Sequence, residues 1–131
     1  ARVAPGVAIA VADAKGVDVH LDVLLWLHPG AGPLGVMALV RLRLGVDQDP
    51  VAPGLLDPAS TDIGEPLDIS SVYAALEGTD GLHSCVVREL YRGATAGLLD
   101  RVPCQPHERL GWAPQGPGTG VRLSFEEVVD R

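Results

Sequence analysis

Residues 17–27 read Val-Asp-Val-His-Leu-Asp-Val-Leu-Leu-Trp-Leu, and this stretch decides the fold. Apolar side chains occupy every second position, and two aspartates and a histidine lie between the first four of them. A period of two is typical of a β-strand that has one face in the core and the other toward water. Residues 7–12 alternate similarly, and Ala14-Lys15-Gly16 between the two runs has the length of a hairpin turn. The sequence therefore predicts an N-terminal β-hairpin.

Helical and extended patterns follow one another through the rest of the chain. The spacing of apolar residues predicts a helix over 34–44, although this segment also alternates as a strand would, and a second helix over 69–77. Further strands are expected over 82–91, near 97–104, near 107–112 and over 121–126. This order predicts an α+β fold, with a small mixed or antiparallel sheet, two short helices packed on it and Gly/Pro-rich connections.

The length of 131 residues predicts a single α+β domain over 1–131. Because the sequence begins with alanine and not with methionine, a second expectation is that the chain is a fragment of a longer protein. Only five residues are aromatic, so the core is expected to be thin and built from Val, Leu and Ala. Residues 45–66 contain four prolines and three glycines and predict a long connection. Residues 92–131 are expected to form a C-terminal segment of short strands.

Acidic residues outnumber basic ones by 17 to 10, which gives a net charge of −7. A phosphate backbone needs a basic face, so nucleic acid and anionic membranes are poor partners for this chain. No apolar stretch is long enough to cross a bilayer, and we expect a cytoplasmic protein without membrane insertion.

Two pairs of potential zinc ligands stand close together in the sequence, His83 with Cys85 and Cys104 with His107. A Cys2His2 set is a common structural zinc site, so a small metal-binding module or an enzyme that uses these residues is the alternative function. Most such sites use a C-x2-C knuckle, which is lacking here. We therefore expect that the four side chains do not converge, that Cys85 packs as a small buried hydrophobic residue, and that the cysteines form no disulfide.

Other patterns that carry chemistry fail at individual positions. Zinc deaminases require a catalytic glutamate in an H-x-E motif, and Ser84-Cys85 follows His83 here. The sequence contains neither a G-x-S-x-G elbow nor a phosphate-binding glycine loop. The spacing of the acidic residues in and after the long connection does not match a calcium-binding loop; they are Asp57, Asp62, Glu65 and Asp68. We predict no enzymatic activity and no cofactor.

A family resemblance lies in Thr-Asp-Ile-Gly-Glu-Pro-Leu-Asp-Ile-Ser-Ser-Val-Tyr-Ala-Ala-Leu-Glu over 61–77, followed by Gly81-Leu82 and the strand at 86–90. With the strand at 17–23, this segment resembles the C-terminal part of baseplate J-like proteins, the wedge components of contractile phage tails and related injection systems. The motif residues, which we expect to be structural, are Gly64, Pro66, Leu67, Ser70, Val72, Tyr73, Leu76, Gly81 and Leu82.

The presence of the motif residues can also be explained by their physical properties. A glycine at 64 or 81 permits a sharp turn, and a proline at 66 fixes φ. Either Asp68 or Ser70 can cap the following helix, which Gly78 can end. We expect Val72 and Leu76 on the buried face of that helix and Glu77 on the exposed one.

The resemblance implies a structural protein that helps to assemble a baseplate and works through interfaces. Its implied partners are other wedge subunits, hub or spike proteins and sheath proteins, in a hetero-oligomeric assembly with several copies of each subunit. A thin core leaves part of the stability to such partners, so the isolated chain is expected to be marginally stable. A third hypothesis for the function is a free-standing α+β domain that binds a small molecule.

Overall fold

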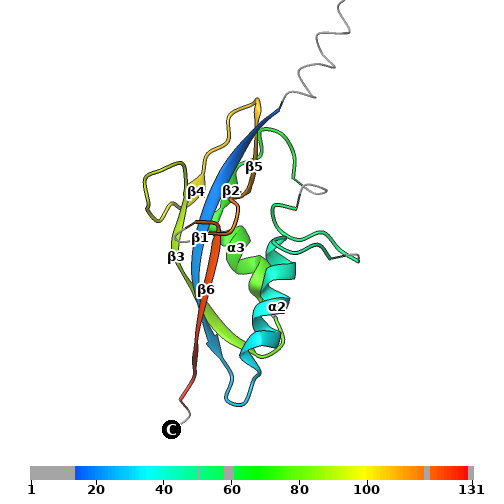
Figure 1. Ribbon diagram of the computed structural model, residues 1–131, viewed down its shortest axis with the longest axis vertical. Coiled ribbons are helices and arrows are strands. Elements are labelled where there is room, and N and C mark those ends of the chain that lie inside the picture. The colour runs from blue at the N-terminus through cyan, green and yellow to red at the C-terminus, as the bar shows by residue number, and fades with distance from the viewer. Residues whose placement is uncertain (1–13, 50, 58–60, 117–118, 130–131) are drawn as a thin grey trace, which may run out of the picture.

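The computed structural model describes residues 14–49, 51–57, 61–116 and 119–129. It confirms the predicted α+β fold: a mixed sheet carries two helices on one face (Figure 1). In chain order the elements are β1 (Lys15–Leu27), α2 (Pro33–Leu44), β2 (Leu67–Asp68), α3 (Ile69–Leu76), β3 (Leu82–Arg92), β4 (Arg101–Val102), β5 (Glu108–Trp112) and β6 (Val121–Glu127).

Strand β1 is the centre of the main sheet. Strand β3 pairs with it antiparallel along one side, where Leu21 lies opposite Leu90. The other side of β1 is shared by two parallel strands placed end to end, with β5 along residues 15–19 and β6 along residues 21–27. The short strands β2 and β4 form a separate antiparallel pair. Mixed pairing on the two sides of one long strand explains why the sheet is neither purely parallel nor purely antiparallel.

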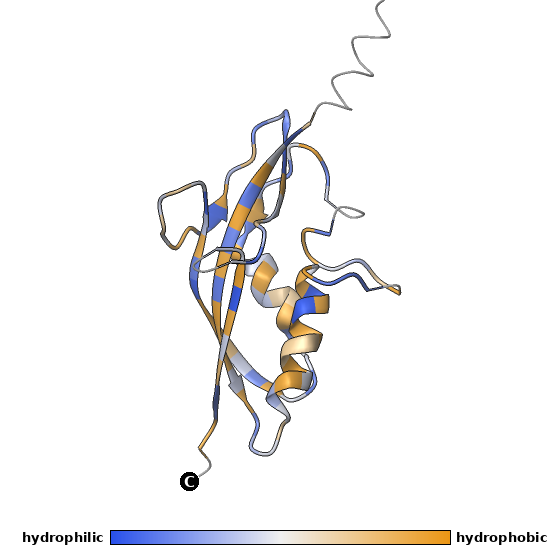
Figure 2. Ribbon diagram, viewed as in Figure 1, coloured by the Kyte–Doolittle hydropathy of each residue, from blue (hydrophilic) through white to orange (hydrophobic). Residues whose placement is uncertain are grey.

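The core lies between the sheet and the two helices. Every second residue of β1, from Val17 to Leu27, is buried, which confirms the strand predicted from the period of two. Figure 2 shows this alternation along β1 as hydrophilic and hydrophobic bands. The helices contribute the buried side chains Val36, Val40 and Leu44 from α2 and Val72 and Leu76 from α3.

The predicted helices are confirmed, and glycines shape the chain directly after α2 and directly before β3. The segment at 34–44, which also had a strand-like alternation, is helical in α2. Gly45 ends α2 with a φ of 83°, and a Cβ at this position would lie 2.3 Å from the carbonyl oxygen of Leu55. Gly81 has a φ of 85°, and a Cβ there would lie 2.8 Å from a methyl group of Val36. Both positions therefore require glycine.

The hairpin prediction is wrong at its turn. Lys15 and Gly16 belong to β1, and the Lys15 amide donates a hydrogen bond to the carbonyl oxygen of His107 at 2.8 Å. Parallel pairing with β5 therefore extends β1 through the expected turn. The other half of the hairpin, residues 7–12, lies outside the described residues.

Two further differences concern short elements. The strand expected near 97–104 is reduced to β4 and a single bridge between Leu90 and Leu98. Strand β2 was not predicted, because its two residues are extended only through their pairing with β4. The strands expected at 82–91, near 107–112 and over 121–126 correspond to β3, β5 and β6.

Candidate interaction surface

The motif residues divide into buried and exposed sets. Leu67, Val72 and Leu76 are buried in the core, as expected for the last two, and Glu77 is exposed. Gly64 has a φ of 82° and makes a left-handed turn, as Gly81 does. The exposed side chains of the motif are those of Pro66, Ser70 and Tyr73.

The predicted capping of α3 by a side chain is wrong. Asp68 occupies the N-cap position, yet its carboxylate makes no hydrogen bond to the first turn of the helix. That carboxylate instead accepts from Nε and Nη2 of Arg101, its neighbour across the β2–β4 pair. The hydrogen bond with Asp68 raises the pKa of Arg101. An ion pair between the short strands therefore replaces the expected cap.

The Tyr73 hydroxyl links α3 to the outer edge of β3 through a hydrogen bond. The Val87 amide donates a hydrogen bond to the Tyr73 hydroxyl at 3.0 Å. The pairing of β3 with β1 shifts register between Asp22 and Val23, next to this contact. The hydroxyl thus satisfies a backbone group that points away from β1. The family resemblance identified Tyr73 as a motif residue, but the sequence gave no signal for this contact.

Between α3 and the first half of β3 lies a groove of about 530 Å³. Two exposed motif residues, Ser70 and Tyr73, line it together with Leu76 and Leu82. Cys85 forms part of the opposite wall, and burial raises the pKa of its thiol. A thiol with a raised pKa is a poor nucleophile, and polar residues line the groove beside it: His83 and Ser84, whose Nδ1 and Oγ atoms lie 3.1 Å apart, and Glu77. The groove combines an apolar floor with a few polar side chains at its walls, so it can accept an apolar group of a partner.

Arg43 joins the two helices at the end of α3. Its Nη1 donates to the carbonyl oxygens of Ala75 and Glu77 at 3.4 and 3.3 Å. These carbonyls belong to the last turn of α3, where a positive charge is favourable. Arg43 also lines a second hollow of about 780 Å³ between the helices and the connection that follows α2. The position of α3, and with it the groove, therefore depends on α2 as well as on β3.

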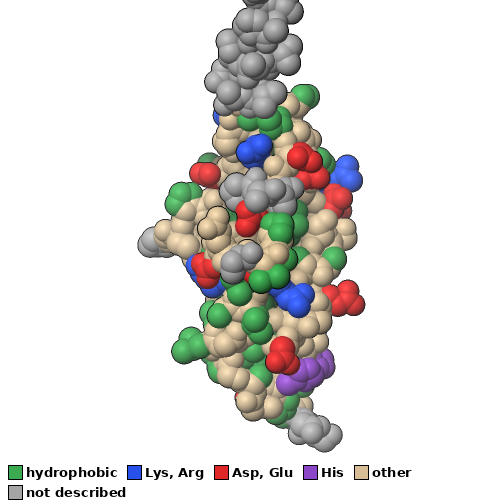
Figure 3. All heavy atoms as spheres, turned by 90° about the vertical axis from the view of Figure 1, so that its right-hand side faces the viewer, with side chains coloured by type: hydrophobic (Ala, Val, Ile, Leu, Met, Phe, Trp, Pro, Cys, Tyr) green, Lys and Arg blue, Asp and Glu red, His purple; other side chains and the backbone are tan. Residues whose placement is uncertain are grey.

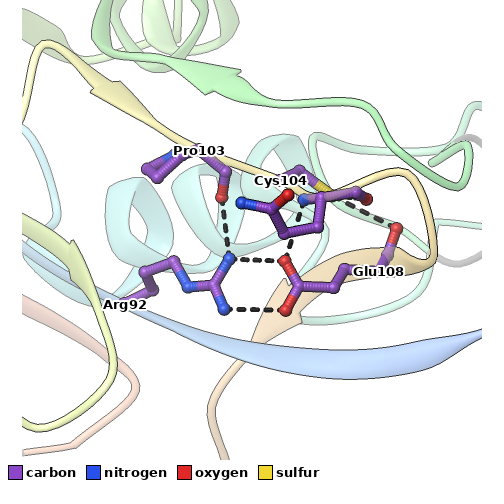
Figure 4. Close-up of polar contacts among 5 residues, drawn as sticks. Arg92, Pro103, Cys104 and Glu108 are labelled. Atoms are coloured by element: carbon purple, nitrogen blue, oxygen red, sulfur yellow. Dashed lines mark hydrogen bonds and ion pairs between the residues drawn. The ribbon is translucent and has the colours of Figure 1, made fainter.

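A polar clamp fixes the far end of β3 (Figure 4). The Arg92 guanidinium donates to both carboxylate oxygens of Glu108, at 2.7 and 2.9 Å, and to the Pro103 carbonyl at 3.0 Å. The Gln105 amide donates to the same carboxylate, and the Cys104 thiol donates to the Glu108 carbonyl at 3.1 Å. The hydrogen bonds from Arg92 and Gln105 lower the pKa of Glu108 to about 2. Its partners are part of the fold itself, so we interpret this clamp as structural.

The structure does not bring the four potential zinc ligands together. Cys85 lies opposite Leu25 near one end of β1, whereas the His107 carbonyl binds the Lys15 amide at the other end. Ten residues of extended strand separate these two levels, or about 33 Å. His83 instead meets His28, with ring centroids 5.3 Å apart. Within the described ranges no three histidine, cysteine or acidic side chains form a cluster suited to a metal ion, and both cysteines are free.

Cys85, which was expected to be buried, is only partly buried: it packs against the core and also lines the groove. The acidic residues in and after the long connection have separate roles. Asp57 is buried, Asp68 binds Arg101, and Glu65 accepts a hydrogen bond from the Asp62 amide.

Comparison with known proteins found no matching family model, no matching curated protein and no matching solved structure. In the part of the chain that the structure describes, no helix is long and apolar enough to cross a membrane.

Proposed function

We propose that this protein is a structural wedge component of a baseplate, in a contractile injection system or a phage-tail-like particle, and that it acts through protein-protein contacts and not as an enzyme. The observation that supports this most is the division of the motif. Its buried members hold α3 in place, and its exposed members Ser70 and Tyr73 line one groove. A subunit that works by assembly needs side chains that are held rigidly and presented outward.

The rest of the surface supports the same proposal. Large apolar side chains are exposed at several places, among them Leu34, which is 83% exposed, and Val129, which is 73% exposed. Figure 3 shows hydrophobic side chains between isolated basic and acidic groups on the side that carries α2. Exposed apolar side chains that lie together in one patch are typical of proteins that bind other proteins. The proposed partners are other wedge subunits, hub or spike proteins and sheath proteins, within a particle assembled in the cytoplasm.

Genetic complementation tests this proposal. Deleting the gene should remove sheathed particles from electron micrographs of cell lysates, and the wild-type gene should restore them. Ala74→Arg places a long cation at the exposed side of α3 in the groove, and this variant should fold but fail to restore particles. Ala96→Arg, in the exposed loop after β3, is the matched control and should restore them. Unchanged particles in the deletion strain would contradict the proposal.

A further inference from the structure

Strand β6 forms a border of the main sheet with an open backbone edge. It pairs with β1 alone, and the hydrogen bonds Leu21 N to Gly120 O and Val128 N to Leu27 O show which residues face β1. Because facing alternates along a strand, Leu123, Phe125 and Glu127 direct their N–H and C=O groups away from β1.

Among the residues that the structure describes, a hydrogen-bond partner is found only at the first outward position of β6. The Val121 amide, which also points outward, donates to the Gln115 side chain at 3.0 Å. Within the described residues, the outward backbone groups of Leu123, Phe125 and Glu127 have no hydrogen-bond partner. An unpaired row of this kind is a template for another strand.

The side chains of β6 are arranged differently on its two faces. Leu123 and Phe125 align with Val23 and Leu25 and therefore lie on the face covered by the helices. Phe125 is 46% exposed there, directly at the open edge. On the opposite face stand Arg122, Ser124 and Glu126, in register with Asp22, Leu24 and Trp26.

We propose that a second copy of this chain adds to β6 in antiparallel orientation, around a two-fold axis at Ser124. In this register Leu123 of each copy lies opposite Phe125 of the other, and Arg122 lies opposite Glu126. The Leu123–Phe125 pairs join residues that direct their backbone groups outward, so each pair exchanges both of its hydrogen bonds. The two sheets become continuous, and both copies use the same residues, as a two-fold interface requires.

Charge selects this register over its neighbours. A shift by one residue would place outward backbone groups opposite inward ones and break the ladder. A shift by two residues would place Ser124 opposite either Arg122 or Glu126, so the two opposite charges would no longer face each other. The register centred on Ser124 pairs Arg122 with Glu126 at both ends, and such cross-strand charge pairs are favourable.

The neighbouring charges are compatible with this arrangement. Arg122 donates to Glu89 through one Nη atom, and its Nε has no partner within the described residues. Arg88 reaches Ser124 Oγ at 2.9 Å and is itself paired with Asp22 at 3.0 Å, so the charge beside the two-fold axis is compensated. This proposal concerns contact between identical chains and does not depend on a role in a baseplate.

Sedimentation equilibrium of the full chain tests the pairing. Wild-type protein should form dimers between about 10 and 500 µM, as expected for a small interface. Glu126→Arg would place two cations opposite each other and should weaken the dimer at least about ten-fold. Glu127→Arg changes the net charge equally, but residue 127 lies opposite Val121, so this exposed control should change the dissociation constant by less than about three-fold. Circular dichroism should be the same for all three proteins.

A cross-link tests the register itself. Ser124→Cys places two thiols across the axis, with Cβ atoms about 4.5 to 5.5 Å apart before adjustment, close to disulfide distance. Mild oxidation should give a dimer in which mass spectrometry finds residue 124 linked to residue 124. Ser84→Cys, on the same sheet face but on β3, should give no such self-link. A wild-type monomer throughout the concentration range, equal weakening by both arginine variants, or equal self-linking at 84 and 124 would each overturn the proposal.

Discussion

Replacing Leu76 by alanine tests whether α3 holds the motif in place. Leu76 is fully buried at the end of α3, where the helix packs on the core beneath the groove. Alanine is a good helix former, so the substitution removes packing and leaves the helix propensity intact. The expected effect is a loss of stability that comes from the core alone.

The magnitude follows from complete burial. The change deletes about three carbon groups, and each buried group contributes about 0.8 kcal/mol, so lost burial alone costs about 2.4 kcal/mol. A cavity that the surroundings fill only partly raises the cost to about 2–5 kcal/mol. For a domain of this size, each kcal/mol lowers the melting temperature by about 3–5 °C. The midpoint should therefore fall by roughly 6–25 °C.

Urea unfolding followed by circular dichroism measures this loss as a change in the free energy of unfolding. The control is Leu34→Ala in α2, which is the same chemical change at a side chain that is 83% exposed. That variant should stay within about 0.5 kcal/mol of the wild type. If both variants lose the same amount, the face of α3 that carries Leu76 is not part of the core, and our account of how the groove is positioned is wrong.

Three further predictions concern individual contacts. Tyr73→Phe removes the hydroxyl that binds the Val87 amide, so it should lower the free energy of unfolding by about 0.5–1.5 kcal/mol and speed hydrogen exchange at Val87. The control is Tyr91→Phe, whose hydroxyl has no hydrogen bond within the described residues, and it should change neither quantity. The folded-state pKa of Glu108 is about 2, against 4.5 for the free group, so the clamp's contribution is present above pH 4.5 and is lost as the pH falls toward 2. Acid titrations followed by fluorescence should therefore show a smaller loss of stability over this range for Glu108→Gln; an equal loss would count against the clamp. Gly81→Ala should lower the melting temperature more than Gly93→Ala does. Both residues have a positive φ, but only at Gly81 would the added Cβ meet Val36. Equal effects would mean that the backbone conformation alone causes the loss of stability.

Sequence periodicity predicted the elements whose local pattern matches their burial. The alternation at 17–27 identified β1, and the spacing of Val72 and Leu76 identified α3, because one face of each element lies in the core. The same reasoning failed for Lys15 and Gly16. Their extended conformation comes from pairing with residues near 108, far along the chain. A local turn signal carries no information about a distant partner strand.

The polar contacts that hold β3 are also non-local. Arg92 and Glu108 are 16 residues apart in the sequence, and Tyr73 is 14 residues from Val87. Each of these polar residues reads locally as an ordinary surface position. Their roles depend on which strands and helices meet, so neither the clamp nor the Tyr73 contact could be predicted from spacing.

The two borders of the sheet are treated differently, and this difference links the fold to assembly. On β3, the Tyr73 hydroxyl binds the Val87 amide, and the backbone of Gly97 and Leu99 binds Leu90. On β6, the Gln115 side chain covers the Val121 amide, and the next outward groups have no partner among the residues that the structure describes. Natural sheets usually protect exposed edges from pairing with other chains. Within the described residues, β6 offers an uncovered row of backbone groups from Leu123 to Glu127, whereas β3 is covered at Val87 and Leu90, and this asymmetry favours an ordered contact between two copies at β6.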